Sequence, residues 1–159
     1  PRRTHRRANN RQDHPMNLIY RATSLLNRIP QSAISLLARV VIGLVFFKSG
    51  LTKLDGFGLS DSAIFLFQEE YKVPLLNPWL AAHLAALAEL TMPILLFAGI
   101  AARFAAAALL GMTLVIQIFV YPEAYVLHGL WAVALLTIMA HGAGVLSIDH
   151  LIRKSMPGK

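Results

Sequence analysis

Long apolar stretches separated by short polar segments dominate the sequence from residue 33 onward. Four of them reach the roughly 20 residues that a helix needs to cross a bilayer. Only a few residues separate the second stretch from the third, so these two are predicted to form a tight antiparallel hairpin. The pattern predicts an all-α fold, a polytopic membrane protein built as a four-transmembrane-helix bundle. The expected spans are about 33–54, 79–100, 102–120 and 128–146.

A short amphipathic helix is predicted at residues 16–30, before the first span. Its apolar residues share one face, whereas Arg21 and Arg28 lie elsewhere on the helical wheel, as in helices that lie in the membrane interface. Residues 1–15 are basic and polar and show no periodicity, so we expect a disordered leader. Met16 resembles a natural start, and we therefore expect the leader to be dispensable.

A second interfacial helix is predicted at residues 61–72. Ser60 is placed to cap its N-terminus, and the helix is expected to end before Pro74. The four-span domain is expected to cover residues 31–153, followed by a basic cytoplasmic tail at 154–159.

The composition agrees with a membrane protein. Of the 159 residues, 56% are hydrophobic and only 14% are charged, whereas soluble domains average about 25% charged residues. The chain has no cysteine, which excludes disulfides, thiolate metal sites and cysteine nucleophiles.

The basic residues are distributed unevenly along the chain. With the N-terminus inside, 11 of the 15 Lys and Arg residues lie on the cytoplasmic side. The loop 55–78 then lies outside, with four acidic residues and one lysine. The positive-inside rule therefore predicts that both termini are cytoplasmic. Because the charge precedes apolar spans and has no interleaved aromatic residues, we expect a lipid bilayer as partner and no nucleic acid.

Glu89 is the clearest candidate for a functional residue. It lies in the middle of the second span, where an ionisable group is costly unless it is paired or hydrated. On the first span, Arg39 and Lys53 share a face with Gly43 and Gly50, which would let another helix approach closely. We expect a buried charge network of these three ionisable residues, with Arg39 as the favoured partner of Glu89 and Lys53 as the second choice. A structural ion pair and a proton-exchanging carboxylate both remain open as roles.

Among the other polar residues of the expected spans, three are considered as candidates. Gln117 is expected to form a hydrogen bond across helices. His128 and His141 belong to the fourth span but face different directions, and neither has the spacing of a metal or haem ligand pair. The sequence predicts no metal site, and no motif for a cofactor is present.

Taken in order, these positions resemble those of the DoxX/DoxD family of small four-span bacterial membrane proteins, over about residues 30–153. The run 115–122, followed by His128 and Trp131, is similar to the subgroup that is linked to the maturation of copper-binding ribosomal peptides. The residues that carry the resemblance are Arg39, Gly43, Gly50 and Lys53 in the first span, Glu89 in the second, Gly99 and Arg103 in the following turn, and Gly142, Gly144, Ser147 and Asp149 at the end.

The resemblance implies a fold more clearly than a function. The family takes its name from a subunit associated with thiosulfate:quinone oxidoreduction, and other relatives are membrane partners of redox or stress-response enzymes. We therefore expect an accessory subunit of a redox or peptide-maturation system with a membrane protein partner. Contact with quinone is compatible with this role, haem is not expected, and the cofactor stays open. The alternatives are a membrane oxidoreductase acting on quinone or thiosulfate, and a small proton-coupled exporter that uses Glu89.

Overall fold

The computed structural model describes most of the chain, namely residues 20, 21, 23, 24, 26–71, 73, 74 and 76–155. The chain forms two compact units, residues 1–30 and residues 31–159. In the first unit, the described residues from Tyr20 to Leu26 are helical. The predicted leader and much of the apolar face of the predicted helix at 16–30 lie outside the described residues, as does the end of the predicted tail.

Four long helices make up the second unit: α2 (Gln31–Leu51), α4 (Pro78–Ala98), α5 (Ala102–Phe119) and α6 (Tyr125–His141). All four are long and apolar enough to cross a membrane, the last when the 3₁₀ turn η1 (Pro122–Ala124) is counted with α6. The predicted all-α, four-helix membrane fold is confirmed.

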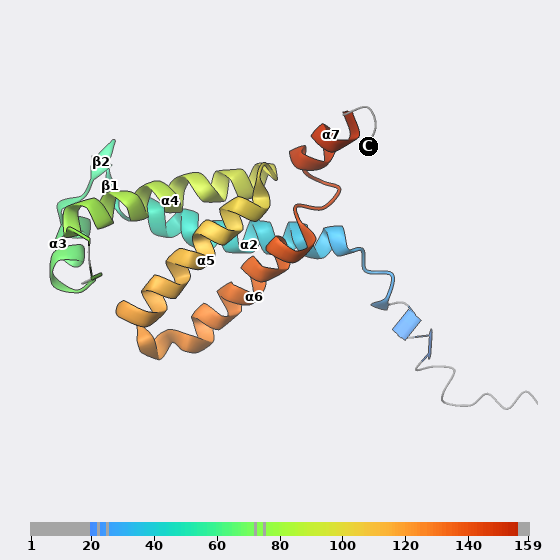
Figure 1. Ribbon diagram of the computed structural model, residues 1–159, viewed down its shortest axis with the longest axis horizontal. Helices are drawn as coiled ribbons and strands as arrows, with labels where there is room; N and C mark the ends of the chain where they lie inside the picture. The colour runs from blue at the N-terminus through green and yellow to red at the C-terminus, as the bar shows by residue number, and fades with distance from the viewer. Residues whose placement is uncertain (1–19, 22, 25, 72, 75, 156–159) are drawn as a thin grey trace, which may run out of the picture. The chain divides into compact units, whose positions relative to one another are not determined.

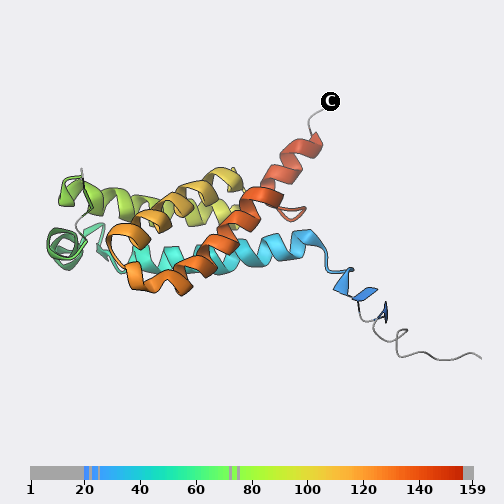
Figure 2. The same ribbon diagram turned by 60° about the horizontal axis from the view of Figure 1, so that its bottom comes forward.

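The four helices pack as a ring in the order α2, α4, α5 and α6, with α6 returning to α2 (Figure 1). Short elements lie at the two ends of this bundle. Figure 2 shows α3 (Asp61–Glu69) at one end and α7 (Ile148–Ser155) at the other.

Small residues and bulky residues share the core of the bundle. Three alanines of α5 are fully buried, namely Ala102, Ala105 and Ala106. Their small side chains allow α4 and α6 each to pack closely against α5. Phe46 of α2 fills the space on the other side, where its ring meets Trp131 edge-on at 5.4 Å between centroids.

The first span ends three residues earlier than predicted. Its helix stops at Leu51, and the chain then forms a two-stranded antiparallel hairpin of β1 (Leu54–Asp55) and β2 (Gly58–Leu59). Gly56 takes a left-handed backbone with φ of 60°, which reverses the chain here. Helix α3 follows, with Ser60 as its N-cap accepting a hydrogen bond from the Ala63 amide, as the sequence indicates.

The fourth span is shifted toward the N-terminus relative to the prediction of 128–146. It begins at Tyr125, or at Pro122 with η1, and ends at His141. Gly142 follows with φ of 76°, which ends the helix. Residues 143–146 are apolar but belong to the connection to α7, so hydrophobicity alone placed the boundary too late.

Candidate functional site

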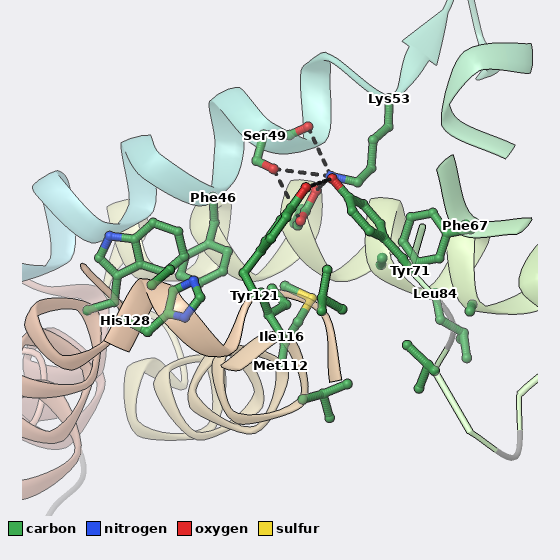
Figure 3. Close-up of a pocket in the computed structure, with 18 of the residues that line it drawn as sticks. Phe46, Ser49, Lys53, Phe67, Tyr71, Leu84, Met112, Ile116, Tyr121 and His128 are labelled. Atoms are coloured by element: carbon green, nitrogen blue, oxygen red, sulfur yellow. Dashed lines mark hydrogen bonds and ion pairs between the residues drawn. The ribbon is translucent and has the colours of Figure 1, made fainter. Parts of the chain in front are cut away.

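A buried ion pair joins the first two spans near one end of the bundle. Lys53 lies two residues beyond α2, and its Nζ is 2.6 Å from Oε2 of Glu89 on α4. Ser49, one turn before Lys53, donates from its hydroxyl to Oε1 of Glu89 and accepts from Lys53 Nζ through its Oγ at 3.1 Å. Figure 3 shows Ser49 and Lys53 side by side, and both residues line the cavity together with Glu89.

The close approach of α2 to α4 at this level depends on Gly50. A Cβ at this position would lie 3.0 Å from the side chain of Leu90 and 3.1 Å from Cβ of Glu89. The absence of a side chain therefore brings Glu89 within reach of Ser49 and Lys53. With only 13% and 5% of the Lys53 and Glu89 side chains exposed, each charge depends on the other for compensation.

The expected pairing of Arg39 with Glu89 is wrong. Arg39 is fully buried, but its guanidinium lies at the opposite end of α4, where it donates to the carbonyl of Leu96 at 3.0 Å and to that of Leu146 at 2.7 Å. The last carbonyls of a helix carry partial negative charge and lack partners within the helix. Arg39 therefore stabilises the end of α4 and connects it to the segment after α6.

Several other residues of the sequence motif meet near this same turn. Asp149 accepts hydrogen bonds from the amides of Ala101 and Ala102, the first groups of α5, which have no partner within their helix. Gly99 has φ of 66°, and a Cβ there would collide with the Arg39 guanidinium and with Ser147. These contacts indicate a structural role for this group.

The remaining motif residues complete the same picture. Arg103 donates to the carbonyl of Ala140 at 3.3 Å, and its guanidinium faces Gly142. The hydroxyl of Ser147 donates to the carbonyl of Gly144 at 2.6 Å. Gly43, farther along α2, lies against Phe97.

A cavity of about 410 Å³ lies next to the ion pair, between the ends of α2, α4, α5 and α6 and beside α3. Aliphatic and aromatic side chains make up nearly all of its wall, and the polar groups are few. Prominent lining residues are Phe46, Phe67, Leu84, Met112 and Ile116, which Figure 3 labels, together with Ala85 and Trp131.

Two tyrosines outside the long helices also line the cavity. The Tyr121 hydroxyl donates to the Tyr71 hydroxyl at 3.0 Å, and the rings of Phe67 and Tyr71 meet edge-on at 5.1 Å. Burial raises the pKa of the Tyr71 phenol above its usual range. Tyr71 is therefore protonated at neutral pH. Sequence reasoning missed both tyrosines; the available signal was that Tyr121 stands between a predicted span and Pro122, and that Tyr71 lies near the end of the predicted interfacial helix 61–72.

His128 is a second polar group of the cavity wall, and Gln117 holds it from outside that wall. Oε1 of Gln117 on α5 lies 2.7 Å from Nδ1 of His128 on α6, which confirms the expected hydrogen bond of Gln117 across helices. The ring of Trp131 lies 5.0 Å from that of His128. His141 lies elsewhere, exposed at the end of α6, with its Nδ1 near the carbonyl of Thr137.

A comparison with known protein families identifies the family of this chain. The profile of the DoxX family matches residues 34–122, more than half of the chain. The chain belongs to the DoxX family. The matched part contains Ser49, Lys53, Glu89 and both tyrosines, so most of the cavity wall lies within the DoxX region, whereas His128 follows it.

One relative covers nearly the same length. A protein of Haemophilus influenzae, described as uncharacterized, is 32% identical over 142 residues, which cover 80% of this chain and 89% of the relative. No solved structure matches the chain.

Proposed function

We propose that this DoxX protein is an accessory membrane subunit of a redox or peptide-maturation system and that it binds a quinone headgroup in its cavity. The cavity carries this proposal. Its volume of about 410 Å³ falls within the 300–1,000 Å³ that is usual for small-molecule sites. A largely apolar wall with a few polar groups suits a flat, apolar ring that carries two oxygen atoms.

The polar groups are distributed in a way that supports such a ligand. Lys53, just beyond α2, and Glu89 on α4 hold each other, Tyr71 approaches from the end of α3, and Tyr121 and His128 approach from the side of α5 and α6. A ligand would therefore contact all four long helices. Binding would stiffen the bundle, as expected for a subunit that responds to the redox state of the membrane.

A fluorescence titration tests the binding. Trp131 lines the cavity, so in a Trp79→Phe background we expect a benzoquinone to quench its emission saturably. An Ala85→Phe substitution adds a ring inside the cavity and should weaken binding at least tenfold. Ala107→Phe adds the same ring on the exposed side of α5 and should leave binding unchanged. Linear, unsaturable quenching, equal in both variants, would contradict the proposal.

The hydrogen bonds that the Glu89 carboxylate accepts favour a binding protein over an exporter. Its two oxygens accept from Ser49 and Lys53, whereas a proton-coupled exporter must release its carboxylate in every cycle. A membrane oxidoreductase acting on quinone or thiosulfate is the alternative proposal. Quinone reduction by the purified chain alone, with thiosulfate as electron donor, would favour it.

The proposed partner is an enzyme of the same system. The resemblance of the run 115–122, with His128 and Trp131, to the subgroup linked to copper-binding peptides supports a peptide-modifying enzyme as the first candidate. Affinity purification of the tagged membrane protein, with mass spectrometry of co-eluting proteins and quinones, identifies the partner.

We also propose that the protein resides in the bacterial inner membrane with both termini in the cytoplasm. Because the chain has no cysteine, single cysteines report on topology directly. In intact cells, a Ser62→Cys variant at the start of α3 should react with an impermeant thiol reagent, and a Ser155→Cys variant at the end of α7 should not. The reverse pattern would overturn the orientation.

A further inference from the structure

The hydrogen bonds of Gln117 fix which nitrogen of His128 carries the proton. Gln117 donates from Nε2 to the carbonyl of Pro122 at 2.6 Å, and a carbonyl can only accept. The amide is thereby oriented with its Oε1 toward His128 Nδ1, at 2.7 Å. Since Oε1 also can only accept, Nδ1 must be the donor. Neutral His128 is therefore held in the tautomer that is protonated at Nδ1.

The other ring nitrogen of His128 is then an acceptor with no partner. Nε2 makes no hydrogen bond with the described residues. Within that part of the chain, the only side-chain polar atoms that are both enclosed by protein and unpaired are Ser35 Oγ and Arg39 Nε. Nε2 is thus unpaired without being enclosed, and His128 lines the cavity (Figure 3). Its lone pair is available to a ligand.

The remaining polar groups of the cavity are largely used within the protein. The three N–H groups of Lys53 have partners in Glu89 Oε2, Ser49 Oγ and the Ser49 carbonyl, and the Ser49 hydroxyl donates to Glu89. Tyr71 accepts from Tyr121, which leaves its own O–H as a free donor. The site therefore offers a free O–H donor at Tyr71, and His128 Nε2 adds an unpaired nitrogen acceptor to the remaining lone pairs of the tyrosine and carboxylate oxygens.

We infer that the cavity selects the reduced quinol over the oxidised quinone, an inference that rests on the proposed function. A quinol hydroxyl can donate to Nε2 of His128, whereas a quinone carries only acceptors and leaves Nε2 facing a carbonyl or an apolar group. An unpaired acceptor in an apolar site costs free energy that a made hydrogen bond does not. Gln117 is the positioning residue, because it sets the tautomer of His128.

Calorimetric titration under anaerobic conditions tests this preference. The probes are 2,3-dimethoxy-5-methyl-1,4-benzoquinone and the corresponding quinol, which lack a tail and dissolve in water. We expect the wild-type protein to bind the quinol roughly tenfold more tightly, the factor that one net hydrogen bond of about 1.4 kcal/mol gives. Equal affinities, or tighter binding of the quinone, would overturn the inference and leave the proposed function intact. Failure of both probes to bind would overturn the proposed function itself.

Three variants separate selection from a general effect on the fold. His128→Phe removes the acceptor and should bring the two affinities within about twofold of each other. Gln117→Leu releases the tautomer and should reduce the preference in the same way, together with a change in the ¹⁵N shifts of the His128 ring. Thr113→Val alters α5 one turn away, outside the cavity wall, and should keep the wild-type preference. A Gln117→Leu variant with the full preference and unchanged ¹⁵N shifts would refute the role of Gln117.

Discussion

A Glu89→Gln variant is expected to unfold at a markedly lower temperature than the wild-type protein in detergent. In the wild-type protein the Lys53 ammonium lies 2.6 Å from the Glu89 carboxylate. The substitution removes this counter-charge, and because little of the Lys53 side chain is exposed, water cannot replace it. Breaking a buried ion pair from one side typically costs about 3–5 kcal/mol. The unfolding temperature is measured by heating samples in detergent and recording the loss of the monodisperse peak in size-exclusion chromatography.

A double variant identifies the partner. Lys53→Met combined with Glu89→Gln removes both charges and both desolvation penalties, so much of the lost stability should return. Arg39→Met combined with Glu89→Gln should show no such recovery, because Arg39 lies at the other end of α4. Lys48→Met, on the exposed side of α2, serves as the control and should change little. Strictly additive losses in the Lys53 double variant would contradict the pairing.

The second large effect is expected at Arg39. A Lys in its place carries the same charge, but its single ammonium cannot reach the carbonyls of Leu96 and Leu146 together as the planar guanidinium does. We expect Arg39→Lys to cost about 1.5–3 kcal/mol, the usual contribution of one hydrogen bond to a charged group. Denaturation in detergent, compared with a Lys48→Arg control on the same helix, measures the loss.

This result also separates the two ends of the bundle. Arg39 acts at the turn between α4 and α5, far along α2 from the cavity, so Arg39→Lys protein that remains folded should bind benzoquinone like the wild type. Wild-type stability of Arg39→Lys, or a selective loss of quinone binding, would show that Arg39 is a site residue.

The sequence alone could predict the membrane fold because hydrophobic length and the placement of charges determine it. The spans at Trp79–Ile100 and Ala102–Val120 fall within two residues of α4 and α5. Glu89 could likewise be recognised as buried, since a carboxylate in the middle of a span needs a partner.

The partner of Glu89 could not be predicted, because a helical wheel gives the face of a residue and not its level relative to another helix. Gly50 lies against Leu90, and Gly43 lies against Phe97. Seven residues back along α2 therefore correspond to seven residues forward along the antiparallel α4. In this register Lys53 is near Glu89, and Arg39 is level with the end of α4. The two helices are joined by the hairpin and α3, and the sequence does not determine how far this connection extends along the helix axes. The register between α2 and α4 therefore cannot be derived from the sequence.

The cavity was beyond sequence reasoning for a related reason. Phe67 and Tyr71 belong to the connection between the first two spans, and Tyr121 to that between the last two. None of them follows a helical period of a long span. Only the packing of α3 against α4 brings Phe67 and Tyr71 to the same space as Tyr121.

Photolabelling with an azido-benzoquinone, followed by peptide mapping, tests most directly whether the cavity binds a quinone. We expect labels on cavity residues such as Met112 and Trp131, and we expect excess unlabelled benzoquinone to remove them. Labels confined to lipid-facing residues such as Phe104 and Leu114, with no competition by the unlabelled compound, would contradict the account.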